Sequence, residues 1–286
     1  MTDPDDTPPE TLQEYFVLQL RRFRHGRGLS QAQLAERINF SPGLISMVET
    51  LQRTPTADFT AACDAALDTG GALSTLLPML ARDTFPKWFQ SFVHLEEEAR
   101  SINEFEVQLI PGLLQTADYA RAVLETAWPP APSVADADGR LTARLARQAV
   151  LERDPPPLLS VVLDESALRR PVGGPSVMAR QLRHLTLVAA RPHVRLHILT
   201  YAQSATAPLD GSFTVLETVH GEHIAYVEAT GGGQLLPDPT DVERLTKTFE
   251  GSRGEALSTA ESINYVDRLR KELYEHRRDS AAVVEE

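Results

Sequence analysis

The chain is 286 residues long, a length typical of about two domains, and its one cysteine excludes an internal disulfide. Apolar residues make up 42% and charged residues 24% of it, with no apolar run near the roughly 20 residues that a membrane span needs. The formal net charge of -12 excludes a uniformly basic surface, so any contact with DNA has to be local.

The first eleven residues are acidic and rich in proline. Such a composition buries too little apolar surface to become ordered, so residues 1–11 are expected to form a disordered acidic arm. The same residues lack the basic and then apolar start of a secretory signal. We therefore expect a cytoplasmic protein that makes no membrane contact.

Residues 12–80 place apolar side chains at helical spacing in several short segments. The spacing predicts a compact bundle with helices over 12–25, 30–38, 42–49 and 56–67. In its middle, Ser30 and Ser41 are suited to cap two helices, and Pro42 occupies a first helical position where its missing N–H is no loss. The turn at 39–41 between them predicts a helix-turn-helix.

The segment LSQAQLAERINFSPGLISMVE, residues 29–49, resembles the XRE-type helix-turn-helix of lambda-type phage repressors. The resemblance implies that helix 42–49 lies in the DNA major groove, while Glu49 has a structural role. The positions that match base-edge contacts are Pro42, Gly43, Ser46 and Met47. The positions that match phosphate contacts are Ser30, Gln31 and Ser41.

Arginines crowd into residues 21–27 and are candidates to neutralise phosphates. The predicted phosphate contacts among them are Arg21, Arg24 and Arg27. Over 12–80, however, six arginines face six acidic residues, and Pro42, Gly43 and Met47 supply no side-chain donor to a base edge. Binding by one copy should be weak and salt-dependent, which favours a homodimer on two half-sites. A helical bundle that only imitates the motif is the alternative.

Downstream, we expect a helical connector over 81–127 and a linker over 128–139. From residue 140 to 286 the pattern changes to a mixed α/β domain for dimerisation or sensing, which makes the whole chain α+β. Its predicted strands are 158–163, 194–199, 213–217 and 223–228. A helix over 176–190 is long enough to make the first two strands parallel, whereas a five-residue connection predicts an antiparallel hairpin for the last two. Helices near 240–250 and 259–277 follow, and residues 231–233 are expected to form a turn.

Several downstream segments resemble one actinomycete family, the WhiJ-like regulators, in which an XRE-type domain precedes a conserved C-terminal domain. The resemblance implies a transcriptional regulator, often encoded beside a small BldB-like partner protein and described as toxin-antitoxin-like. The segments that carry it are 110–123, 143–151, 163–174, 178–185, 210–217 and 226–228.

The C-terminal half offers few candidates for chemistry. Asp164 and Glu165 are either paired carboxylates or, more simply, a helix cap and an ion pair with Arg169. Arg169 and Arg170, before a Gly-Gly turn, are either a solvated face or the site of an anionic ligand or partner. No histidine has a cysteine or carboxylate at metal-ligand spacing, so no metal, cofactor or catalytic residue is expected.

Two functions follow from these patterns. The first is a sequence-specific, dimeric DNA-binding regulator controlled through its C-terminal domain by a small protein partner or ligand. The alternative is an antitoxin-like interaction module that sequesters a partner and binds little DNA itself.

Overall fold

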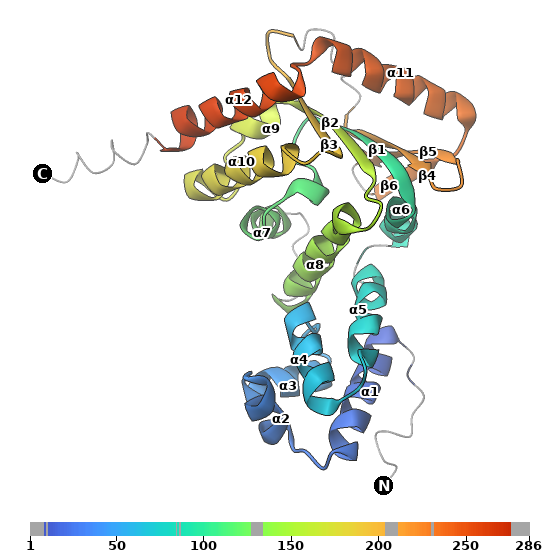
Figure 1. Cartoon of the computed structure of the whole chain (residues 1–286), viewed down its shortest axis with the longest axis vertical. Helices are drawn as coiled ribbons and strands as arrows, with labels where there is room; N and C mark the ends of the chain where they lie inside the picture. The colour runs from blue at the N-terminus through green and yellow to red at the C-terminus, as the bar shows by residue number, and fades with distance from the viewer. Residues whose placement is uncertain are drawn as a thin grey trace, which may run out of the picture. The chain divides into compact units, whose positions relative to one another are not determined.

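The computed structural model shows two compact units (Figure 1). One contains Met1–Pro86 and Ala127–Ala146, and the other contains Lys87–Thr126 and Arg147–Glu286. The structure describes residues 9, 11–83, 85, 87–126, 134–203, 211–229 and 232–275. The expected acidic arm falls almost entirely outside these residues.

The N-terminal unit is built from helices, as predicted. They are α1 (Leu12–Gly26), α2 (Gln31–Ile38), α3 (Pro42–Glu49), α4 (Ala57–Leu67), α5 (Ala72–Asp83) and most of α8 (Val134–Arg147). The side chains of Ser30 and Ser41 cap α2 and α3 by accepting backbone hydrogen bonds, from Gln33 and Leu44. Asn39 ends α2 in the left-handed conformation, with φ 57°, which permits the tight turn into α3. The predicted helix-turn-helix is therefore confirmed.

One apolar core joins the helices of this unit. Phe16 and Leu20 of α1 and Leu34 of α2 are fully buried together with Ile45 of α3. Phe59 of α4 completes this core and meets Phe40 edge-on, with ring centroids 5.6 Å apart. The helix-turn-helix of α2 and α3 is thus held by two neighbouring helices, α1 and α4.

The C-terminal unit contains a six-stranded mixed sheet in the order β3-β2-β1-β4-β5-β6. The strands are β1 (Ala99–Glu106), β2 (Leu158–Asp164), β3 (Val194–Leu199), β4 (Phe213–Thr218), β5 (His223–Ala229) and β6 (Gly232–Leu236). Strands β1, β2 and β3 are parallel, while β4, β5 and β6 continue the sheet antiparallel. The predicted parallel pair and the predicted hairpin are both confirmed.

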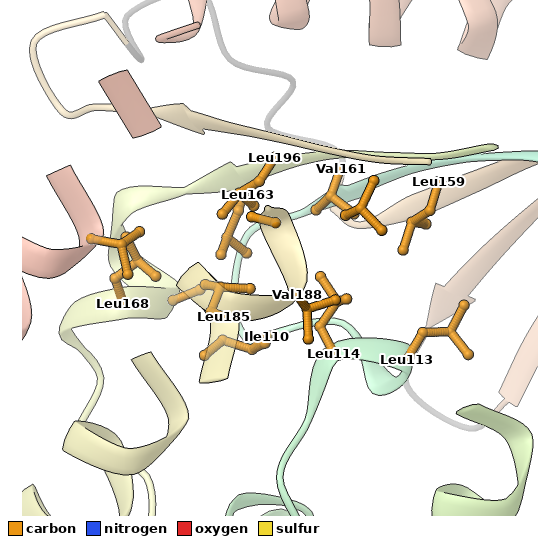
Figure 2. Close-up of a cluster of buried hydrophobic side chains, with 14 of the residues drawn as sticks. Ile110, Leu113, Leu114, Leu159, Val161, Leu163, Leu168, Leu185, Val188 and Leu196 are labelled. Carbon is orange, nitrogen blue, oxygen red and sulfur yellow. The ribbon is translucent and has the colours of Figure 1, made fainter. Parts of the chain in front are cut away.

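Helices cover both faces of this sheet. The longer ones are α6 (Lys87–Glu97), α7 (Ala117–Thr126), α10 (Pro175–Ala189), α11 (Pro239–Glu255) and α12 (Thr259–Arg270). The short helical turns are Gly112–Leu114, Gln148–Glu152, α9 (Glu165–Arg169) and Lys271–Glu275. Helices α6, α7, α10 and α12 bury apolar side chains against one face, and α11 covers the other. Figure 2 shows the first core, where Leu185 and Val188 of α10 lie beneath Val161 and Leu163 of β2.

The expected helical connector over 81–127 is wrong, because β1 lies within it and occupies the middle of the sheet. The helical prediction failed since the strand ARSINEFE has few large apolar residues, and Glu104 stands on the same buried face as Ile102. In addition, α8 begins at Val134, inside the expected linker 128–139. Residues 127–133 of that region lie outside the described part of the chain.

The expected turn at 231–233 is also wrong from Gly232 onward, since β6 begins there. The hydroxyl of Tyr226 occupies the space that a Cβ on Gly233 would need. Glycine is therefore required at this position by a close side-chain approach in the sheet, and not by a turn.

Candidate nucleic-acid interface

Helix α3 keeps one face open. Pro42 and Gly43 are exposed, and Ser46 and Met47 are partly exposed. At about 100° per residue these four positions share one arc of the helix. The buried residues of α3, which are Ile45, Val48 and Glu49, lie on the opposite side. The structure thus brings the four predicted base-edge residues together on one surface.

The chemistry of this surface is sparse. Pro42 and Gly43 carry no side-chain donor, and no atom lies within 4 Å of a Cβ added at Gly43. Small side chains allow a helix backbone to approach another molecule closely. Of the four positions, Ser46 offers a hydroxyl and Met47 an apolar contact, so discrimination between bases would depend mainly on these two.

A buried polar network fixes α3 to α1 and α2. The Nε and Nη2 groups of Arg24 donate hydrogen bonds to the two carboxylate oxygens of Glu49 over 2.7 and 2.8 Å. Its Nη1 donates to the Leu29 carbonyl over 2.9 Å. Gln31 Nε2 donates to Glu49 Oε2 over 2.8 Å, and Arg21 Nη2 to the Glu49 carbonyl over 2.6 Å. Only 8% of the Arg24 side chain and 2% of the Glu49 side chain are exposed.

This network corrects one predicted phosphate contact. Arg24 cannot reach a phosphate, because its guanidinium is buried and its N–H groups donate hydrogen bonds to Glu49 and to the Leu29 carbonyl. Arg21 and Gln31 also donate to Glu49, although Arg21 keeps 27% of its side chain exposed. Glu49 has the structural role that the resemblance implied.

The remaining predicted phosphate contacts are at the surface. Ser30 and Ser41 are exposed at the N-termini of α2 and α3, where helix dipoles favour an anion. Arg27 is also exposed and forms an open ion pair with Asp68 over 3.1 Å. A water-exposed pair of this kind is weak enough to yield to a phosphate.

Sequence reasoning left out Arg53, which follows α3 by four residues. Its Nη2 lies 3.9 Å from Asp138 of α8, which is a long ion pair. The signal that could have identified it is a basic residue within one turn after the predicted recognition helix. We add Arg53 to the candidate phosphate contacts.

The two candidate carboxylates of the C-terminal unit, Asp164 and Glu165, make contacts that stabilise the fold. Asp164 caps α9 by accepting the Ser166 N–H over 2.8 Å. Glu165 accepts the Arg169 Nε–H over 2.5 Å and the Tyr201 N–H over 2.9 Å. Burial alone would raise the pKa of Glu165, but the hydrogen bonds from Tyr201, Tyr265 and Arg169 lower it. Both carboxylates are therefore explained without catalysis.

The two predicted ligand-binding arginines differ from each other. Arg169 is committed to Glu165, and its guanidinium also lies 5.7 Å from the Tyr201 ring centroid. Arg170 is exposed. An anionic ligand at this pair stays a prediction.

No helix in the described part of the chain combines the length and apolar composition that a bilayer span requires. No curated protein and no solved structure matches the chain significantly. Residues 16–77 match the family model of a helix-turn-helix domain. Residues 89–268, more than half of the chain, match the model described as Domain of unknown function (DUF5753). The protein therefore belongs to the DUF5753 family and carries, ahead of that domain, the helix-turn-helix domain of a DNA-binding regulator.

Proposed function

We propose that this protein is a sequence-specific transcriptional regulator that inserts the open face of α3 into the DNA major groove. The observation that carries the proposal is the Arg24–Glu49–Gln31 network, which holds α3 rigidly while Pro42, Gly43, Ser46 and Met47 stay at the surface. A preorganised helix loses little conformational freedom when it binds, and the capped N-termini of α2 and α3 supply neighbouring phosphate contacts.

The charge balance supports a dimer. Residues 12–80 carry six arginines against six acidic residues, so one copy has little electrostatic attraction for DNA. Two copies on half-sites about 10 base pairs apart would double the contacts. In this proposal the C-terminal unit supplies dimerisation and receives a signal, with a small BldB-like protein as one candidate partner, and the protein acts in the cytoplasm.

The test uses the full chain and duplexes that it enriches from a random pool, with affinity measured by fluorescence anisotropy. Gly43→Glu places a carboxylate on the open face of α3 without a steric clash. We expect it to weaken binding about a hundredfold, because the added charge meets phosphates and displaces contacts in the groove. The matched control is Gly251→Glu in α11, an equally open helical glycine, which should leave affinity unchanged.

Salt provides the second readout. The affinity of the unaltered chain should fall steeply between low and moderate salt, since phosphate contacts release counterions. If the chain enriches no duplex, or Gly43→Glu binds as tightly as Gly251→Glu, the proposal fails. An interaction module that sequesters a partner would then be the better description.

A further inference from the structure

Glu104 is a carboxyl group inside the C-terminal sheet with no bonding partner in the described part of the chain. It lies in the central strand β1, in register with Val161 of β2 and Thr214 of β4, and is only 9% exposed. No described residue makes a hydrogen bond or ion pair with it. Burying such a group costs free energy unless something compensates, so its position requires a physical reason.

Further polar groups lie beside Glu104. In register across the sheet from Thr214 is Tyr226, whose hydroxyl donates to Glu228 Oε1 over 3.3 Å. Two residues along β1, on the same face as Glu104, Glu106 accepts the Ser212 hydroxyl over 2.6 Å. We call Glu104, Glu106, Tyr226 and Glu228 the acidic face.

The acidic face runs from the interior to the surface. Glu104 is buried, Glu106 is partly buried and Glu228 is exposed. Glu106 is also the last residue of β1, at the carboxyl end of the parallel strands, where open α/β sheets commonly bind ligands. The acidic face thus reaches solvent at Glu228.

The charge of the acidic face is not balanced by the helices above it. Arg147, at the end of α8, is the one described cation that acts on Glu104. Its Nε lies 2.8 Å from Glu96 Oε2 of α6, so its nearest ion-pair partner is Glu96 and not Glu104. Its guanidinium is further held against the Phe89 ring, 5.1 Å from the centroid. In the described part of the chain, none of the carboxyl groups of Glu104, Glu106 and Glu228 forms an ion pair.

Aromatic rings stand next to these carboxyl groups. The Tyr226 ring stacks on Phe92, with centroids 4.2 Å apart, and meets Phe89 at 5.9 Å. Carboxylates combined with aromatic rings are the groups that recognise ammonium and guanidinium ions. A metal ion fits less well, because no three His, Cys, Asp or Glu side chains in the described ranges converge in a ligating arrangement.

We propose that the acidic face binds the ammonium or guanidinium group of a small organic cation, with Glu104 and Glu106 as its anionic partners and Tyr226 as an aromatic wall. This inference goes beyond DNA binding and does not depend on it.

Protonation supports the same assignment. Burial, and then the neighbouring Glu106 and Glu96, raise the pKa of Glu104 well above its usual value. Burial raises the pKa of Glu106 to about 7, against the hydrogen bond from Ser212. Near neutral pH the free face therefore retains protons, which a bound cation would displace.

The test is calorimetry on the full chain without DNA. The probes are methylammonium, putrescine and argininamide, together with butanediol and succinate as the uncharged and anionic counterparts of putrescine. We expect saturable binding of at least one cationic probe and none of butanediol. Titrations in two buffers of different ionisation heat should show that protons are released.

Two isosteric variants assign the site. Glu104→Gln should weaken the binding of the responding cation at least about tenfold, since a charge-assisted hydrogen bond is lost. Glu106→Gln should do the same. The control Glu243→Gln alters an exposed glutamate of α11 and should change nothing. Because Glu104→Gln replaces an unpaired carboxyl by a neutral group of the same shape, it is expected to fold.

The proposal is overturned if none of the three cations binds saturably, or if the affinity survives Glu104→Gln. Tighter binding of succinate than of putrescine would overturn it as well, because Arg147 would then be the binding group. All of these outcomes are independent of whether α3 binds DNA.

Discussion

Glu49 and Glu104 are both buried carboxyl groups, one in each unit, with opposite surroundings. Glu49 receives hydrogen bonds from Arg24 and Gln31, and its backbone carbonyl accepts another from Arg21. Glu104 has no such donor among the described residues, and its nearest charges are mostly other carboxyl groups. A buried polar group that makes its hydrogen bonds within the chain stabilises the fold. A buried polar group without such bonds marks a place where ligand binding can offset the free-energy cost of its desolvation.

The largest effect should come from removing the hydrogen bonds between Arg24 and Glu49. We expect Arg24→Ala to lower the free energy of unfolding by about 3–5 kcal/mol, because it leaves Glu49 buried and uncompensated. Urea unfolding followed by circular dichroism measures this. The control Arg22→Ala alters an exposed neighbour on α1 and should cost under about 0.5 kcal/mol. Equal costs for the two variants would show that the network does not hold α3.

The second-largest effect should come from removing the charge of Glu106 from the acidic face. The folded-state pKa of Glu106 is raised from 4.5 to about 7 by burial, so Glu106 favours folding at low pH and loses this contribution as pH rises through that window. Glu106→Gln should therefore become more stable than the unaltered chain as pH rises from 5 to 7, by up to about 1.4 kcal/mol per pH unit.

Asp64 gives the matched comparison in the N-terminal unit. Burial would raise its pKa, but hydrogen bonds from Ser74, Thr69 and Leu73 lower it. The stability that ionised Asp64 contributes is therefore lost only when the pH falls below the ordinary pKa of an aspartate. The stability difference between Asp64→Asn and the unaltered chain should then stay flat from pH 5 to 7, in the same urea titrations. A rising difference for Asp64→Asn, or a flat one for Glu106→Gln, would contradict the contrast between the units.

The smallest effect should come from the exposed arginine of the open ion pair. Arg27→Ala should leave stability within about 0.5 kcal/mol of the unaltered chain, since its partner Asp68 is 84% exposed. It should weaken binding to enriched and unrelated duplexes alike and reduce the salt slope by about one. Anisotropy titrations over a range of salt measure both. A loss confined to the enriched duplex would show that Arg27 contacts bases.

The same contrast explains what the sequence could and could not predict. Strands β2 and β3 were predicted because continuous apolar runs form them, and α2 and α3 because Ser30, Ser41 and Pro42 are local signals. Strand β1 was missed because a buried Glu104 breaks the apolar pattern that marks a strand. Arg24 was assigned to phosphates because its partner lies 25 residues away, and local patterns do not show such pairs.

The measurement that tests the central claim most directly is selection from a random duplex pool with the full chain and with Met47→Ala. The account predicts that both proteins enrich sequences with two related half-sites, and that their preferences differ at one or two adjacent base pairs in each half-site, where residue 47 meets the groove. Identical preferences for the two proteins would contradict the claim that the open face of α3 reads DNA.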